Sequence, residues 1–467
     1  MFAVLLFAVL AINATFAQEP PAAAQKLAHQ ARDAGLRGNW LQAVAGYEKA
    51  VQLAPRNPIF RAELGVALIK SGRPADAIAV YQEALRISPR NVSAEVGLAQ
   101  AYRGVHNHDQ ARRTLERAIR EHPKAAAPLA VLGDLEIELQ TYDAAIGHLR
   151  AALALDPSNT DARDRLASSY RSKGDSESAL AQIENVLARD PQNALAFYLR
   201  AEIYSDRNQD DRALPDAQKV VELQPQNPRG RILLGKILVR TPEGAPAAEV
   251  TDRCSRAVEI LKPLVGAQAN DSETLFLLSR AYRCAGNSEE AQKTLAAFEA
   301  ASQGDRSAKE NEAQARHLVQ EANERALKND LPGALDLLHQ ALGKFPNFGA
   351  AYSQLAKLYY SAGDVEKASE AISHALELEP FQPDFLYVQG KVFERQGKFD
   401  EALASFERTA LVNPMESDAY FEIGILYEKR NDRARALAAY KKALELSPDD
   451  DDYRRALTAL AARKSSP

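Results

Sequence analysis

Few residues in this chain have the types and spacing that catalysis or metal binding requires. The nearest approach to a metal site is His106 and His108, two residues apart in the segment 105–109. Zinc sites use three or four protein ligands, and no third ligand lies nearby. We therefore interpret both imidazoles as turn residues. The chain also lacks a Gly-x-x-x-x-Gly-Lys-Ser/Thr loop, a His-Glu-x-x-His helix and a Gly-x-Ser-x-Gly elbow. We predict no catalytic residue, no metal and no cofactor.

Composition excludes several other classes of protein. Two cysteines in 467 residues cannot build a disulfide-rich scaffold or a four-thiolate zinc site. The net charge of −5 lacks the strongly basic character of a nucleic-acid binder. With 46% hydrophobic and 26% charged residues, the chain is ordinary for a folded soluble protein.

The first residues are similar to a secretory signal. An unbroken apolar run, residues 2–12, is followed by small residues ending at Ala17. We expect residues 1–17 to be a signal peptide, which places the protein in the periplasm, outer envelope or medium. The run is too short to span a bilayer, and no later stretch is apolar enough to do so. Secretory signals normally begin with a positive charge, but here no Lys or Arg precedes Lys26. If the leader does not function, the protein is cytoplasmic.

A period of 34 residues runs through most of the chain. Prolines recur at this spacing at positions 55, 89, 123, 157, 191 and 225, and again at 346, 380, 414 and 448. An Ala lies twelve residues before each of these prolines. A fixed period of this length is typical of a solenoid built from stacked short units.

The residues within each unit resemble the tetratricopeptide repeat family. When the Pro is set as residue 32, the eighth residue is small, as in Gly65 and Gly424, and the eleventh is aromatic, as in Tyr102 and Tyr427. Residue 27 is Ala in most units. The resemblance covers about residues 24 to 450 and implies two antiparallel helices in each unit. Chaperone-associated relatives grip a carboxylate with a Lys at residue 5, and no unit has one there.

We therefore predict an all-α, open, right-handed superhelical solenoid of antiparallel helix pairs. Gly or Asn between the two apolar halves of a unit favours a left-handed helix end. Units 1–6 occupy residues 24–227, irregular units 7 and 8 with two inserts occupy 228–314, and units 9–12 occupy 315–450. Residues 451–467 are expected to be a capping helix and tail. Ser302, Gly304 and Asp305 lie in a segment, 301–306, that we interpret as a flexible joint.

Cys254 and Cys284 are the two residues that could form a covalent link. We place Cys254 at the start of the second helix of unit 7 and Cys284 at the end of the first helix of unit 8. Because adjacent helices in such a stack are antiparallel, both residues fall at the same end of one helix pair. A disulfide and two separately buried thiols both fit this placement.

The resemblance also indicates a binding surface. In the family, residues 2, 5, 6, 9, 12 and 13 of the first helix line the inner wall. In units 7–9 these positions carry a basic set: Arg229, Lys236, Arg240, Arg280, Arg283 and Arg316. The following units are mixed, with Lys357, Lys391 and Arg395 alongside Asp384, Glu394, Asp418 and Glu428. The basic set could bind an acidic peptide segment, or it could be a solvated face with local ion pairs.

Only 59 residues lie outside the repeats, too few in any one place for a catalytic domain. We predict a non-enzymatic, exported scaffold or adaptor that binds protein or peptide through its concave surface, in envelope or export assembly. The alternative is a regulatory or substrate-docking arm of an enzyme carried on a separate chain. The sequence does not indicate an oligomeric state, and an RNA-binding helical repeat is disfavoured by the net charge.

Overall fold

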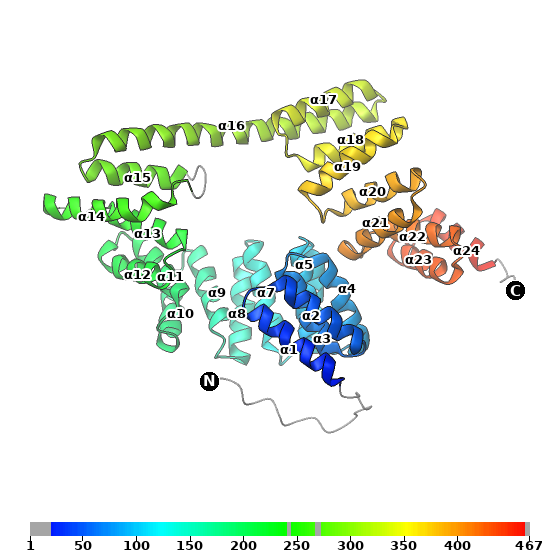
Figure 1. Ribbon diagram of the computed structural model, residues 1–467, viewed down its shortest axis with the longest axis horizontal. Helices are drawn as coiled ribbons and strands as arrows, with labels where there is room; N and C mark the ends of the chain where they lie inside the picture. The colour runs from blue at the N-terminus through cyan, green and yellow to red at the C-terminus, as the bar shows by residue number, and fades with distance from the viewer. Residues whose placement is uncertain (1–19, 241–243, 267–271, 463–467) are drawn as a thin grey trace. The chain divides into compact units, whose positions relative to one another are not determined.

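The computed structural model describes residues 20–240, 244–266 and 272–462. In these ranges the regular secondary structure is helical throughout (Figure 1). The chain divides into two compact units, Met1–Thr114 and Leu115–Pro467, and each is described by itself. The predicted signal peptide, residues 1–17, lies outside the described residues. No helix among the described residues has both the length and the apolarity to cross a membrane.

In the first unit the helices are α1 (Ala22–Leu36), α2 (Trp40–Leu53), α3 (Pro58–Lys70), α4 (Pro74–Ile87) and α5 (Val92–Gly104). Helix α6 (His108–Glu121) contributes residues to both units. The second unit begins with α7 (Ala126–Glu138), α8 (Tyr142–Leu155), α9 (Thr160–Ser172), α10 (Ser176–Arg189), α11 (Ala194–Asp206) and α12 (Asp210–Leu223). It continues with α13 (Pro228–Leu238), α14 (Ala247–Leu261), the short 3-10 helix η1 (Lys262–Leu264), α15 (Ser272–Cys284) and α16 (Ser288–Leu327). The last helices are α17 (Leu331–Lys344), α18 (Gly349–Ala362), α19 (Val365–Leu378), α20 (Pro383–Arg395), α21 (Phe399–Val412), α22 (Ser417–Lys429), α23 (Arg433–Leu446) and α24 (Asp451–Ala462).

The helices form consecutive packed pairs, as the 34-residue period predicts. Asn57, Asn91, Asn159, Asn193 and Asn227 each precede a first helix, and each side chain accepts a hydrogen bond from a backbone N–H of that helix's first turn. Each of these caps satisfies a donor that the helix itself leaves without a partner. The predicted all-α fold of helix pairs is confirmed.

The turns inside the pairs have the backbone that the sequence predicts. Positive φ angles occur at the Gly and Asn residues expected there: Gly38, Gly72, Gly174, Gly286, Gly363, Gly397, Asn208, Asn329 and Asn431. His106 and Gln140 adopt the same left-handed conformation, with φ of 59° and 58°. His106 therefore has the turn conformation that we inferred for it. The same inference for His108 is wrong, because His108 is the first residue of α6. The ring centroid of His106 lies 6.1 Å from that of His108.

Small residues let the two helices of a pair approach closely. A Cβ atom built on Gly424 of α22 would lie 2.4 Å from the ring of Tyr440 on α23. Real Cβ contacts are never this short, so the aromatic ring occupies the space that the glycine leaves. Tyr440 is 2% exposed, and its position explains the pairing of a small eighth residue with a large residue on the second helix.

Helix α24 covers the last pair. Its buried residues are Tyr453 and Leu460, and Leu460 joins Tyr440 in one apolar cluster. Asp451 and Asp452 lie in its first turn, where the helix dipole favours negative charge. The predicted capping helix at the C-terminal end of the repeats is confirmed.

The predicted flexible joint at residues 301–306 is wrong. Residues 288–327 form one helix, α16, which serves as the second helix of one pair and the first helix of the next (Figure 1). One Gly costs a helix only about 1 kcal/mol relative to Ala, and α16 contains no Pro. Ion pairs between Glu and Lys or Arg four residues apart, such as Glu289 with Lys293, add support along the helix.

Candidate functional site

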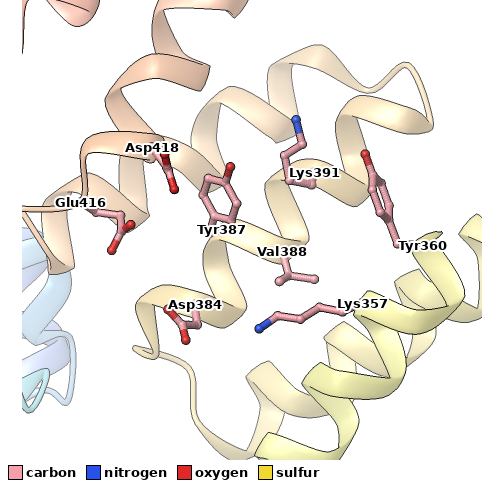
Figure 2. A pocket seen from close by; sticks show the side chains of 8 residues that line it. All are labelled: Lys357, Tyr360, Asp384, Tyr387, Val388, Lys391, Glu416 and Asp418. Atoms are coloured by element: carbon pink, nitrogen blue, oxygen red, sulfur yellow. The ribbon is translucent and has the colours of Figure 1, made fainter. Parts of the chain in front are cut away.

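A groove in the C-terminal part of the second unit is a candidate site. It encloses about 330 Å³ and is lined by side chains from α18, α20 and the segment that enters α22 (Figure 2). The lining residues are Lys357, Tyr360, Asp384, Tyr387, Val388, Lys391, Glu416 and Asp418. All except Glu416 fall at the first-helix positions that the repeat pattern assigns to the inner wall. Successive first helices therefore present their side chains to one shared space.

Lys391 is held in place by carboxylates on two helices. Its Nζ lies 2.9 Å from Glu394 Oε2 on α20 and 2.8 Å from Glu422 Oε1 on α22. Burial disfavours the charged ammonium, but the hydrogen bonds to Glu422 and Glu394 outweigh burial and raise the pKa of Lys391. Glu394 is also paired with Lys429, at 2.8 Å. This network fixes the orientation of one side of the groove.

Tyr387 contributes an aromatic face with a fixed hydroxyl. Its Oη donates a hydrogen bond to Glu422 Oε1 at 3.3 Å, and its ring packs 5.4 Å from the ring of Phe406. Burial, followed by the negative charge of Glu422, raises the pKa of Tyr387 above its usual range. The hydroxyl therefore stays protonated at neutral pH.

The other end of the groove is acidic. Burial, and then the charges of Asp418 and Asp384, raise the pKa of Glu416. Asn413 donates a hydrogen bond to Glu416 at 3.1 Å, and Tyr453 of α24 donates one to Asp418. Among the described residues that line the groove, Asp384, Glu416 and Lys357 form no ion pair, in contrast to Lys391. The charge at this end of the groove is therefore opposite to that of a Lys or Arg side chain.

The predicted basic set lies on three helices. The first three residues, Arg229, Lys236 and Arg240, lie on α13 or directly after it. Arg240 is used inside the fold, because its Nη1 donates to the Ser205 carbonyl at 2.9 Å and lies 3.6 Å from Asp210 Oδ1. Arg229 is exposed and Lys236 is half-buried.

The other three members of the basic set lie on α15 and α16. Arg280 and Arg283 are exposed and one turn apart on α15, so the structure brings them together. Arg316 pairs with Glu312 at 2.7 Å and lies next to Ala315, where α16 enters the core of the following pair. That an acidic segment binds the basic set stays a prediction.

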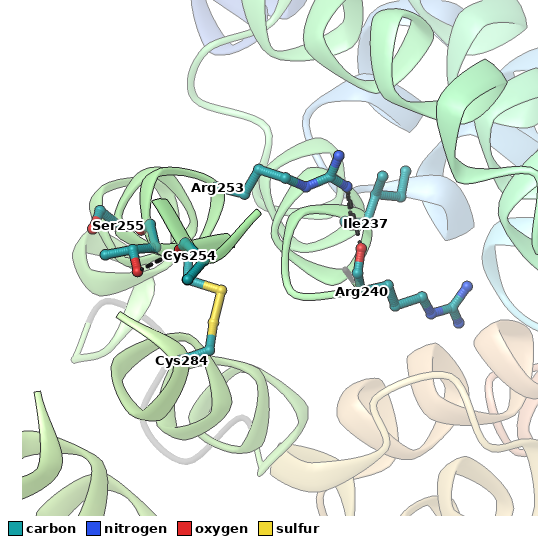
Figure 3. The surroundings of a disulfide bond; sticks show 8 residues. Ile237, Arg240, Arg253, Cys254, Ser255 and Cys284 are labelled. Carbon is teal, nitrogen blue, oxygen red and sulfur yellow. Dashed lines mark hydrogen bonds between the residues drawn. A yellow bond between two sulfur atoms is a disulfide. The ribbon is translucent and has the colours of Figure 1, made fainter. Parts of the chain in front are cut away.

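The structure joins Cys254 of α14 to Cys284 of α15 by a disulfide, with the Cα atoms 5.9 Å apart (Figure 3). Cys284 is the last residue of α15, as expected. The placement of Cys254 at the start of its helix is wrong, because α14 begins at Ala247, seven residues earlier. The helix therefore begins about two turns before the expected position.

Arg253, next to the disulfide, was not identified from the sequence. It is 7% exposed, and its Nη2 lies 3.3 Å from the carbonyl oxygen of Ile237 and 3.2 Å from that of Arg240 (Figure 3). A guanidinium at this place satisfies the carbonyl groups that the end of α13 leaves without partners. Burial of an Arg depends on the tertiary contacts, which one sequence does not reveal.

Gly230, Gly235 and Lys236 have the spacing of part of a phosphate-binding loop, although Ile237 follows instead of Ser or Thr. The structure has these residues inside α13. A Cβ on Gly235 would lie 2.6 Å from Leu261, so this glycine serves the packing of α13 on α14.

Comparison with known families identifies the repeat. Two family profiles, both described as tetratricopeptide repeat, match the chain: one at residues 16–92, 165–228 and 387–451, the other at residues 68–135 and 326–392. Together these ranges span more than half of the chain. The chain belongs to the tetratricopeptide repeat family. Tetratricopeptide repeats generally mediate protein–protein interaction. No curated protein matches the chain.

Solved structures of tetratricopeptide repeat proteins and of related helical arrays are similar to this chain at low identity. A tetratricopeptide repeat protein from Parabacteroides merdae is 20% identical, with a TM-score of 0.41, over 56% of this chain and 98% of that chain. YrrB, described as having an unusual peptide-binding site, is 23% identical, with a TM-score of 0.32, over 39% of this chain and 95% of that chain. Human IFIT1, crystallised as a dimer with m7Gppp-AAAA, is 16% identical, with a TM-score of 0.39, over 83% of this chain and 89% of that chain. None of these likenesses carries an argument about what this chain binds.

Proposed function

We propose that this tetratricopeptide repeat protein is a non-enzymatic, exported scaffold that holds a segment of another protein in the groove lined by α18, α20 and α22. The observation that carries the proposal is the groove itself, about 330 Å³ in volume. Its lining combines two tyrosines with charged groups of both signs, a combination suited to an extended peptide with polar and cationic side chains.

Charge complementarity selects the class of peptide. Burial, and then the negative charges of Asp418 and Asp384, raise the pKa of Glu416. A Lys or Arg side chain placed among these three carboxyl groups would offset their negative charge. Lys357 of α18 can pair with an acidic side chain or a terminal carboxylate of the segment. The preferred segment therefore carries a basic residue that lies between Asp384 and Asp418.

A selection experiment tests this proposal. A random peptide library displayed on phage is selected on the intact protein, and the enriched peptides are measured for affinity against Asp384→Lys/Asp418→Lys. We expect enrichment of peptides with Lys or Arg and at least about tenfold weaker binding to the variant. The control is Glu366→Lys/Glu370→Lys, which changes the same charge on exposed positions of α19. Equal binding to all three proteins would rule out the groove as the site.

Export is supported by the apolar leader and the small residues before Gln18. Proximity of Cys254 and Cys284 also fits an oxidising compartment. Amino-terminal sequencing of the protein purified from its native host tests this part. We expect the mature chain to begin at Gln18, and an intact amino terminus recovered from the cytoplasmic fraction would contradict export.

A further inference from the structure

Residue 27 of a regular unit is buried by the helix that follows. Gly230 on α13 shows the contact directly, because a Cβ there would lie 2.6 Å from Val220, residue 27 of the preceding unit. Ten regular units bury this residue to 1% exposure or less: Ala50, Ala84, Ala118, Ala152, Val186, Val220, Ala341, Ala375, Thr409 and Ala443. The position is therefore a marker of whether another helix covers the unit.

The unit that starts at residue 272 has Phe298 at this position, and Phe298 is only half-buried. The next first helix in sequence is the C-terminal part of α16 itself, and a continuous helix cannot fold back onto its own residue 298. Between Ala291 and Ala315, α16 has no buried residue. The face of α15 and α16 that a regular array would cover is thus left open in the described residues.

Aromatic and basic side chains gather on this open face. The ring centroids of Phe276 and Phe298 are 5.3 Å apart, and Phe276 is 40% exposed. The Arg280 guanidinium lies 5.9 Å from the centre of the Phe276 ring. Arg283, one turn further along α15, is exposed. Among the described residues, neither arginine has an acidic partner. We call Phe276, Arg280, Arg283 and Phe298 the α15 platform.

We propose that the α15 platform binds an acidic segment of a partner protein that carries an aromatic or aliphatic side chain between its carboxylates. The exposed ring of Phe276 and the half-buried ring of Phe298 offer apolar contact to that side chain. Two guanidinium groups offer bidentate hydrogen bonds to flanking carboxylates, which lysines could not match in geometry. The inference rests on the proposed scaffold function but concerns a separate surface, whose charge preference is opposite to that of the groove.

The test uses the full chain and a labelled peptide of alternating Glu and Phe residues, measured by fluorescence anisotropy. Arg280→Glu/Arg283→Glu should weaken binding at least about tenfold and reduce its dependence on salt. Phe298→Ala restores the residue type of the regular units, so this variant should fold, and it should also weaken binding. The matched control, Arg256→Glu/Lys262→Glu, changes the same charge on exposed positions of α14 and η1.

Several outcomes would overturn the proposal. These are equal binding to the wild type and to Arg280→Glu/Arg283→Glu, no binding of the Glu–Phe peptide, or equal binding of a Lys–Phe peptide. A dimer in sedimentation experiments that dissociates only in Arg280→Glu/Arg283→Glu would assign the platform to a second copy of the chain instead. Loss of groove binding in Asp384→Lys/Asp418→Lys leaves the platform measurement unaffected, so the two proposals fail separately.

Discussion

Lys391 of α20 and Glu422 of α22 lie 2.8 Å apart, and this ion pair links two successive first helices beside the groove. Glu422 is 8% exposed and also accepts a hydrogen bond from the hydroxyl of Tyr387. One buried carboxylate therefore positions two of the residues that line the candidate site. In a repeat array each unit contacts only its neighbours, so such a link stabilises both the array and the site.

Replacing Glu422 with Ala should destabilise the C-terminal repeats. Loss of a hydrogen-bonded charge that leaves its partners in place costs about 1–3 kcal/mol. Urea unfolding followed by circular dichroism measures the change. Glu445→Ala, which removes the exposed partner of Lys442, is the control and should change stability by less than about 0.5 kcal/mol. Similar effects of both substitutions would show that the Glu422 network does not hold the helices together.

The Cys254–Cys284 disulfide should be present in the native protein. Titration of thiols on denatured, unreduced protein should find none, whereas two would refute the bond. The bond closes a separation of 30 residues, and its loss in Cys254→Ala/Cys284→Ala should cost about 3 kcal/mol. Hydrogen exchange then should rise in α14 and α15, since the bond joins these two helices.

Asp164 of α9 should make stability fall as the pH rises. Burial, only partly offset by a hydrogen bond from Asn193, raises the pKa of Asp164 to about 6. In the unfolded chain this carboxyl ionises near its ordinary value, so between about pH 4 and pH 6 the folded protein binds more protons and loses stability as they dissociate. Above that range the folded state retains a buried charge.

Asp164→Asn keeps the shape of the side chain and removes the charge. We expect it to stabilise the protein at neutral pH by about 1–2 kcal/mol and to match the wild type near pH 3.5. Denaturant unfolding at several pH values provides the comparison. A variant that is less stable than the wild type at neutral pH would argue against a buried, ionised Asp164.

Substitutions at Gly304 test the continuity of α16. No atom lies within 4 Å of a Cβ built at this position, so Gly304→Ala should be accommodated and should stabilise the helix by up to about 1 kcal/mol. Gly304→Pro should break the helix and cost about 3 kcal/mol. Circular dichroism and hydrogen exchange across residues 296–314 report the difference. A flexible joint would tolerate both substitutions equally.

Periodic residues made most of the fold predictable. Pro and Asn at the unit boundaries, Gly or Asn in the turns and a small eighth residue each impose a local backbone or packing requirement, so one sequence was sufficient to infer the helix pairs. The inner-wall positions likewise included Lys357, Tyr360, Asp384, Tyr387, Val388, Lys391 and Asp418. Glu416 was missed because it precedes α22 and lies outside those positions.

The errors fall where the period is interrupted. Gln303 occupies position 32 of its unit, where a regular unit has Pro. Because no Pro ends the helix there, α16 continues through Gly304. The second helix of unit 7 was expected to begin at Cys254, although α14 begins at Ala247. The buried Arg253 and the half-buried Phe298 depend on which helix lies opposite, which the sequence pattern does not specify.

Site-specific photo-cross-linking tests the groove most directly. A benzophenone side chain replaces Tyr360 in one protein and Glu366 of α19 in another, and each is irradiated with a selected Lys- or Arg-containing peptide. We expect a covalent peptide adduct at position 360 and none at position 366. Adducts at position 366 alone, or at neither position despite measurable binding, would contradict the assignment of the groove as the binding site.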